Sequence, residues 1–127
     1  MNESVRLLIV DDHPLFRQGL VDVFETDPRM EVVGEAINGE EAMEQARACR
    51  PEIVIMDVNL PNGNGLQVTR QILSELPSTK VIILTGYDNT EQIFHSLKIG
   101  AVAYCAKDIP PDDLLNTIYA VRQGRIV

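Results

Sequence analysis

Five short runs of apolar residues alternate along the chain with longer stretches in which apolar positions recur every three or four residues. The runs cover residues 5–10, 30–36, 53–56, 80–84 and 101–106. Runs of this length are typical of β-strands, whereas the recurring spacing between them is typical of amphipathic helices. Regular alternation of strand and helix predicts an α/β protein, with a parallel sheet, helices on both faces and right-handed crossovers.

The apolar positions of each helical stretch define the face that we expect to pack on the sheet. These positions are Phe16, Leu20 and Val23; Ala42, Ala46 and Cys49; Thr69, Ile72 and Leu76; Ile93 and Leu97; and Leu115, Ile118 and Val121. Asn38 or Gly39 is suited to begin the second helix. Gly100 and Gly124 are suited to the positions that follow a helix. The pattern therefore predicts five helices, one after each strand.

The second run differs from the others because it carries charges. Glu31 and Glu35 would be costly in a central strand, so we expect this strand at an edge of the sheet. A doubly wound (βα)5 sheet with strand order 2-1-3-4-5 follows. This order places the first and third strands side by side at a topological switch point, where open α/β sheets bind ligands at the carboxyl ends of their strands.

The length and charge of the chain narrow the class of protein further. A chain of 127 residues corresponds to one domain. Its net charge is −8 and its eleven Lys and Arg residues are scattered, which argues against direct binding to nucleic acid. No apolar stretch approaches the ~20 residues that span a bilayer, and residues 1–10 do not resemble a signal peptide. We therefore expect a cytoplasmic protein without membrane contact.

Three carboxylates stand at the ends of the first and third strands. Asp11 and Asp12 follow the first strand, and Asp57 follows the apolar run of the third. Three carboxylates that converge do not all stay ionised without a cation, and oxygen ligands favour Mg²⁺. We expect Asp12, Asp57 and the backbone carbonyl of Asn59 as direct ligands, with Asp11 acting through water. Imidazole is a poor Mg²⁺ ligand, so we expect His13 to help begin the first helix instead.

Two more strand ends lie on the same rim of the predicted sheet. The fourth run ends at Thr85 and Gly86, and the fifth leads to Lys107. A hydroxyl and an ammonium group that face a metal-bound carboxylate suit phosphoryl transfer. We expect Asp57 to attack phosphorus in line, while Mg²⁺, Lys107 and the Thr85 hydroxyl hold the phosphoryl oxygens. Gly86 leaves room for those oxygens.

These motifs together resemble the receiver domain of two-component response regulators, and the resemblance covers the whole chain. It is carried by Val10-Asp11-Asp12-His13-Pro14, Met56-Asp57-Val58-Asn59-Leu60-Pro61 with Gly65 after it, Leu84-Thr85-Gly86, and Tyr104 three residues before Lys107. Residues 11–20, DDHPLFRQGL, and the pair Lys107-Asp108 resemble more narrowly the NarL/LuxR-type transcription regulators. The resemblance implies the flavodoxin-like, or CheY-like, form of the (βα)5 fold.

The resemblance also implies a phosphorylation-dependent signalling switch that is not an enzyme, although it assists its own phosphorylation and dephosphorylation. Asp57 would accept a phosphoryl group from a phosphohistidine on a sensor histidine kinase, with Asp11 and Asp12 holding Mg²⁺. Thr85 and Lys107 would bind the phosphoryl group, and Tyr104 would respond together with Thr85.

In the NarL/LuxR-type regulators a helix-turn-helix DNA-binding domain follows a linker. We therefore expect residues 1–124 to form the receiver domain and residues 125–127 to begin the linker to an output domain. DNA would be bound only through that domain, and phosphorylation would promote a homodimer. A receiver that stands alone and signals through protein contacts is the main alternative, and a receiver that is never phosphorylated is another.

Two features of the sequence bear on the lifetime and geometry of the site. Asn59 and Tyr87 are expected to set the lifetime of the phosphoryl group, with Tyr87 shielding it from water. Asp108 replaces the proline that is commoner in receivers, so a cis peptide bond after Lys107 would be a costly non-proline one.

A magnesium-dependent phosphatase of the haloacid-dehalogenase type is disfavoured, because its general acid would stand at the position of Asn59.

Overall fold

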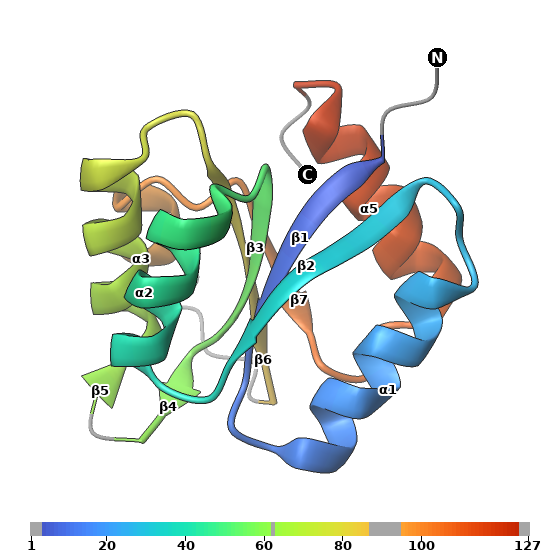
Figure 1. The fold of residues 1–127 in the computed structure, drawn as a ribbon, viewed down its shortest axis with the longest axis horizontal. Helices are drawn as coiled ribbons and strands as arrows, with labels where there is room; N and C mark the ends of the chain where they lie inside the picture. Colours follow the sequence, from blue (N-terminus) through green and yellow to red (C-terminus); the bar gives the residue numbers. More distant parts are fainter. Residues whose placement is uncertain (1–3, 62, 87–94, 125–127) are drawn as a thin grey trace.

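The protein is a five-stranded parallel sheet between two layers of helices (Figure 1). The computed structural model describes residues 4–61, 63–86 and 95–124. The strands of the sheet are β1 (Val5–Val10), β2 (Met30–Ala36), β3 (Ile53–Asp57), β6 (Lys80–Thr85) and β7 (Ala103–Ala106). They lie in the order β2-β1-β3-β6-β7, and every neighbouring pair is parallel. In chain order this is 2-1-3-4-5, so the predicted α/β fold and its strand order are confirmed.

The helices cover the sheet in pairs. Helices α2 (Gly39–Cys49) and α3 (Gly65–Glu75) lie on one face, and α1 (Pro14–Glu25) and α5 (Pro111–Arg122) lie on the other (Figure 1). Where the fourth helix is expected, residues 95–98 are helical. The apolar face expected there is wrong at Leu97, which is 45% exposed, because the helix turns Ser96 inward instead. Ile93 lies outside the described residues.

Strand β3 is buried on both faces, which explains its uninterrupted apolar sequence. Ile53 and Ile55 pack in the core cluster beneath α1 and α5. Val54 and Met56 alternate with them and pack in the cluster beneath α2 and α3. Burial of each such side chain contributes about 1.5–3 kcal/mol to the free energy of folding. Packing on both faces therefore fixes the position of the strand that ends in Asp57. Strand β2 lies at the edge, as predicted, with Glu31 and Glu35 exposed.

The helix ends use side chains and positive backbone angles as the sequence predicts. Asn38 caps α2, because its side chain accepts a hydrogen bond of 2.8 Å from the backbone N–H of Glu41. Gly100 and Gly124 have φ of 107° and 87°, a region that favours glycine. At the end of α5, Lys80 donates a hydrogen bond of 2.8 Å to the carbonyl of Val121.

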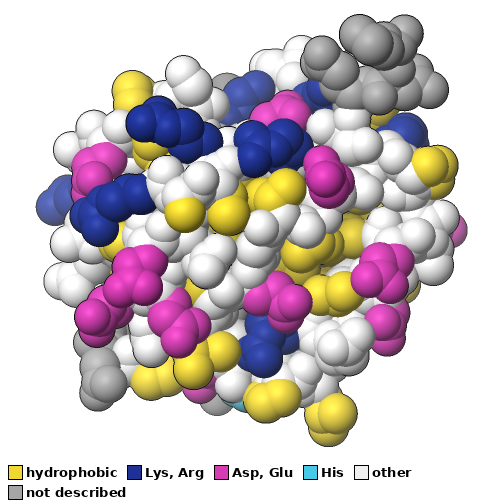
Figure 2. Space-filling view, viewed as in Figure 1, with side chains coloured by type: hydrophobic (Ala, Val, Ile, Leu, Met, Phe, Trp, Pro, Cys, Tyr) yellow, Lys and Arg dark blue, Asp and Glu magenta, His cyan; other side chains and the backbone are white. Residues whose placement is uncertain are grey.

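Charge is unevenly distributed over the face shown in Figure 2. Lys and Arg side chains gather over its upper part, near the amino ends of the strands, and Asp and Glu side chains gather lower down. Arg6 donates hydrogen bonds to the carbonyls of Cys49 and Arg50 at the end of α2. Cations at helix carboxyl ends complement the helix dipole. None of the described helices is long and apolar enough to cross a membrane.

Candidate functional site

The structure brings together the carboxylates that end β1 and β3. Asp11 and Asp57 are buried, with 2% and 1% of their surface exposed. Asp12, the next residue after Asp11, keeps 32% of its side chain exposed. One ligand atom from each of these residues and one from His13 all lie within 4.8 Å of one another. Because β1 and β3 are neighbours in the sheet, their carboxyl ends converge as the strand order requires.

Two hydrogen-bond donors hold the carboxylate of Asp57. Its Oδ1 accepts a hydrogen bond of 3.1 Å from the backbone N–H of Asn59, and its Oδ2 lies 3.2 Å from Nζ of Lys107. Burial raises the pKa of Asp57, and the charge of Asp11 raises it further, whereas the Asn59 N–H and Lys107 lower it. Burial dominates, so this carboxyl is more costly to ionise than an exposed one, and a cation beside it would offset that cost.

Lys107 reaches across the sheet from the residue after β7. Its Nζ lies 2.9 Å from Oδ2 of Asp11 and 3.2 Å from Oδ2 of Asp57. The same nitrogen lies 4.7 Å from the centre of the Phe16 ring, a cation–π contact from α1. Three carboxylates and one ammonium group leave a net charge of about −2 in this cluster.

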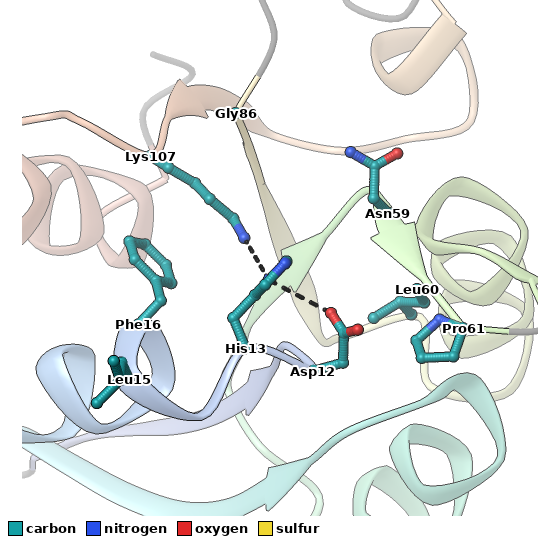
Figure 3. Close-up of a pocket in the computed structure, with 9 residues that line it drawn as sticks. All are labelled: Asp12, His13, Leu15, Phe16, Asn59, Leu60, Pro61, Gly86 and Lys107. Atoms are coloured by element: carbon teal, nitrogen blue, oxygen red, sulfur yellow. Dashed lines mark hydrogen bonds and ion pairs between the residues drawn. The ribbon is translucent and has the colours of Figure 1, made fainter.

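His13 belongs to the site, which the sequence did not predict. It immediately precedes α1, but its side chain caps no N–H of that helix among the described residues, so the predicted part in starting the helix is not seen in its side chain. The imidazole turns toward the acids instead, and Figure 3 shows it between Lys107 and Asp12. Its Nδ1 lies 2.8 Å from Asp11 Oδ1, 3.3 Å from Asp12 Oδ1 and 3.6 Å from Asp57 Oδ2. Its position directly after the two acids was the only signal of this in the sequence.

The cluster fits a divalent cation. Oδ1 of Asp12 is buried and makes no hydrogen bond with any described residue, although it lies 3.3 Å from His13 Nδ1. A buried carboxylate oxygen without a hydrogen bond is costly, and a metal ion would satisfy it. Three carboxylates supply hard oxygen ligands, and together with Lys107 they leave a net charge of about −2, which suits Mg²⁺. Asn59 lies beside them at the start of a two-stranded hairpin, β4 (Asn59–Leu60) and β5 (Gly63–Asn64).

Arg17 holds the backbone that carries the acids, another role that the sequence did not reveal. Its Nη1 donates a hydrogen bond of 2.8 Å to the carbonyl oxygen of Asp11. Its Nε donates one of 3.0 Å to Oε1 of Glu35, at the end of β2. The guanidinium group therefore ties α1 and β2 to the turn between Asp11 and Asp12.

Gly65 allows α3 to begin directly against the backbone of Asp57. A Cβ at Gly65 would lie 2.1 Å from the carbonyl oxygen of Asp57, far inside van der Waals contact. The N–H of Gly65 donates a hydrogen bond of 2.8 Å to the carbonyl of Val58. Asn64 caps the helix, because its side chain accepts a hydrogen bond of 2.7 Å from Leu66 N–H. No side chain larger than hydrogen fits this junction.

Of the remaining predicted residues, Thr85 and Gly86 lie at the same rim. Thr85 is buried at the end of β6, and Gly86 follows it as an exposed residue with no described atom within 4 Å of an added Cβ. Tyr104 is half-buried in β7 and packs against the core cluster beneath α2 and α3. Tyr87 lies outside the described residues. No described peptide bond is cis, so the bond from Lys107 to Asp108 is trans.

A pocket of about 1020 Å³ opens above the acids (Figure 3). Its lining residues are Asp12, His13, Leu15, Phe16, Asn59, Leu60, Pro61, Gly86 and Lys107. Leu15 is 90% exposed at its rim. Asp57 and Thr85 are buried and do not line this pocket, whereas Asp12 and Lys107 do, so an anionic group that enters it comes close to Lys107 and to any cation that Asp12 helps to hold. The arrangement can neutralise an incoming phosphoryl group and present a carboxylate oxygen to it.

Comparisons with known proteins agree with this geometry. Residues 7–119 match the family model of the response regulator receiver domain. The chain is 40% identical over 121 residues to the DNA-binding transcriptional activator DevR/DosR of Mycobacterium tuberculosis, covering 95% of this chain and 56% of that protein.

Solved structures show the same likeness. The signal receiver domain of the response regulator NarL from M. tuberculosis has a TM-score of 0.92 at 32% identity, covering 97% of this chain and 99% of that one. A two-component response regulator of the LuxR family from Aurantimonas sp. has a TM-score of 0.92 at 32% identity, covering 98% and 89%. The chain belongs to the family of response regulator receiver domains, and its relatives are regulators of the NarL/LuxR type.

Proposed function

We propose that Asp57 accepts a phosphoryl group from a phosphohistidine on a sensor histidine kinase, and that this modification switches the activity of a transcription regulator. The observation that carries the proposal is the position of Asp57. Its carboxylate is 1% exposed, lies among two further acids and is 3.2 Å from Nζ of Lys107, at the base of the pocket. A carboxylate that only stabilised the fold would not need this costly setting.

In this proposal Mg²⁺ is held directly by Asp12, Asp57 and the backbone carbonyl of Asn59, and by Asp11 through water. When bound, the ion would neutralise charge on the phosphoryl oxygens. The unsatisfied Oδ1 of Asp12 supports the assignment, because it is a buried ligand atom without a hydrogen bond to any described residue. Arg17 keeps the Asp11 carbonyl in place behind these ligands.

The transfer itself requires little beyond positioning. A carboxylate oxygen of Asp57 forms a bond to phosphorus as the bond from phosphorus to the donor imidazole nitrogen breaks, and the electron pair leaves with that nitrogen. Lys107 neutralises the phosphoryl oxygens from one side, and the Thr85 hydroxyl donates to one of them. Gly86 adds no side chain at the mouth of the pocket. The chain thus assists its own phosphorylation and, through an attacking water, its dephosphorylation, without being an enzyme in the usual sense.

The switch would pass through Thr85 and Tyr104. Residue pairing between β6 and β7 matches Ile83 with Tyr104 and Thr85 with Ala106. Paired residues of parallel strands share a face, and so do residues two apart, so the side chains of Thr85 and Tyr104 lie on the same face of the sheet. A phosphoryl group that draws the Thr85 hydroxyl inward would open space for the half-buried Tyr104 ring.

The proposal that an attached domain carries out the response is based on the relatives of this chain. The chain spans about half the length of the curated relatives it matches, among them a DNA-binding transcriptional activator. We propose that DNA is bound through an output domain of this kind and not by the receiver, and that phosphorylation promotes a homodimer. Cytoplasmic location follows from a kinase partner of this class. A stand-alone receiver that acts through protein contacts is the second candidate, favoured by the five-stranded sheet covered by helices on both faces that the described residues form.

A phosphodonor experiment tests the proposal. The protein is incubated with acetyl phosphate, with and without Mg²⁺, and its intact mass is measured. Wild type should gain one phosphoryl group only with Mg²⁺, and Asp57→Asn should gain none. If wild type gains none, the receiver is one that keeps its acids without being phosphorylated. Multiple turnover of a phosphate ester would instead favour a phosphatase, a reading that Asn59 disfavours because it replaces the required acid.

A further inference from the structure

The imidazole of His13 is placed as a ligand, although its neighbours are suited to Mg²⁺. Its Nδ1 lies 2.8, 3.3 and 3.6 Å from one oxygen of Asp11, Asp12 and Asp57 respectively. Two atoms that bind one metal at about 2.1 Å from adjacent octahedral corners lie about 3.0 Å apart, and tetrahedral corners lie about 3.4 Å apart. The spacing of Nδ1 from the acids therefore matches that of two ligands on one ion.

A hydrogen bond of 2.8 Å between His13 Nδ1 and Oδ1 of Asp11 holds this orientation, and no helix-capping contact competes with it among the described residues. His13 is the N-cap residue of α1. The side chain at an N-cap usually accepts a hydrogen bond from a backbone N–H of the first helical turn, yet the His13 imidazole accepts none from the described residues of α1. The ring is 58% exposed, so solvent was available to it. The Asp12 oxygen that it approaches is the buried one that makes no hydrogen bond within the described chain.

We infer that His13 is a metal ligand, and that it gives this site a preference for divalent transition metals over Mg²⁺. The inference rests on the proposed metal site of Asp11, Asp12 and Asp57 and names a further ligand of it. Imidazole binds Ni²⁺, Co²⁺ and Zn²⁺ well and Mg²⁺ poorly, and carboxylate sites already follow the order in which affinity rises from Mn²⁺ to Ni²⁺. His13 adds a ligand that only the transition metals use.

Lys107 is the group that such an ion must displace. Its Nζ lies 3.2 Å from His13 Nδ1 and 2.9 Å from Asp11 Oδ2, so it occupies the position of a cation beside the same ligands. The ring of Phe16 and the open pocket lie next to the ammonium group and leave it a place to move to. A divalent ion carries one more positive charge than the ammonium group of Lys107. Because the cluster has a net negative charge, this difference favours replacement of the ammonium group by the ion.

Ni²⁺ and Mg²⁺ make a matched pair for the test, because both take six ligands and differ in their affinity for imidazole. Calorimetric titration with each ion is done on wild type, His13→Ala and His13→Asn; the Asn variant keeps a good residue at the start of α1. His95→Ala is the control, because the chain has two histidines and residue 95 is exposed.

Both His13 variants should lose Ni²⁺ affinity by tenfold or more, with less than a twofold change for Mg²⁺. Ni²⁺ should also broaden the imidazole proton resonances of His13 in NMR spectra and leave those of His95 sharp. Unchanged Ni²⁺ affinity, or equal losses for both ions, would overturn the inference. If wild type still takes a phosphoryl group with Mg²⁺ in that case, the proposed function stands without it. If it takes none while Ni²⁺ binding depends on His13, the proposed function fails alone.

Discussion

Nζ of Lys107 lies 3.2 Å from Oδ2 of Asp57, although 50 residues separate them in the chain. The contact exists because β3 and β7 flank β6 on either side, so their carboxyl ends open on the same rim. It joins a carboxylate whose pKa is raised by burial to a cation that also contacts Asp11. The order of the strands in the sheet therefore brings the reactive side chains of the site together.

Lys107→Ala should reduce the rate of phosphorylation by a small phosphodonor by about 100-fold, the usual cost of removing one group that stabilises transition-state charge. The rate is measured from the phosphoprotein fraction at early times by intact mass. Lys98→Ala, which removes an exposed lysine outside the pocket, is the control and should leave the rate within about twofold. Equal rates for the two variants would show that Lys107 does not act on the phosphoryl group.

Asp57→Asn should stabilise the metal-free protein, and the gain should depend on pH. Burial raises the pKa of Asp57 in the folded state, so the folded state holds this proton more tightly than the unfolded chain does. Stability therefore falls as pH rises from the ordinary pKa to the raised one, and the penalty is complete above it. Asn removes the charge and so removes the penalty at pH 7.

The unfolding temperature in the presence of a chelator measures this effect. The gain should be several degrees at pH 7, since about 1 kcal/mol corresponds to about 4 °C for a domain of this size, and it should shrink as pH approaches 4. Asp108→Asn, at an exposed position outside the cluster, is the matched control. A variant that is less stable than wild type at pH 7 would mean that the contact with Lys107 outweighs burial.

Gly65→Ala and Gly19→Ala should change stability in opposite directions. The Cβ at residue 65 would lie 2.1 Å from the Asp57 carbonyl oxygen, so α3 must move away, at a cost of about 3 kcal/mol. The Cβ at residue 19 would meet nothing within 4 Å, and alanine in a helix is about 1 kcal/mol better than glycine. Urea unfolding of both variants tests the pair, and a Gly65 variant as stable as wild type would show that the junction is loose.

Arg17→Ala should weaken Mg²⁺ binding by about tenfold, because residues that hold ligands in place commonly contribute that much. The guanidinium group donates to the Asp11 carbonyl and to Glu35, and its loss frees the turn that presents Asp11 and Asp12. Mg²⁺ titration by calorimetry measures the change, with Arg70→Ala on the exposed side of α3 as the control. If both variants bind Mg²⁺ as wild type does, the turn is held by other contacts.

Much of the fold could be predicted because it depends on patterns of burial. The charges of Glu31 and Glu35 placed β2 at the edge, and the bounds of β1 and β2 agree with the apolar runs at 5–10 and 30–36. Leu97 is an exception, because the spacing of apolar residues does not reveal that Ser96 is the residue that faces inward.

The site was predictable only where a strand end determines the position of a side chain. Asp11, Asp57 and Lys107 are of this kind, and the structure places all three at one rim. The orientation of the His13 imidazole depends on one side-chain rotation at the start of a helix, which no spacing predicts. The contacts of Arg17 and Phe16 depend on how α1 packs, and that also follows from the assembled fold.

Mapping the phosphorylated residue tests the central claim most directly. The protein is phosphorylated by acetyl phosphate with Mg²⁺, the acyl phosphate is reduced with borohydride, and the modified residue is identified by peptide sequencing in a mass spectrometer. The account predicts that Asp57 alone is converted to homoserine. Conversion at Asp11 or Asp12, or a phosphoryl group on His13 with Asp57 unmodified, would contradict it.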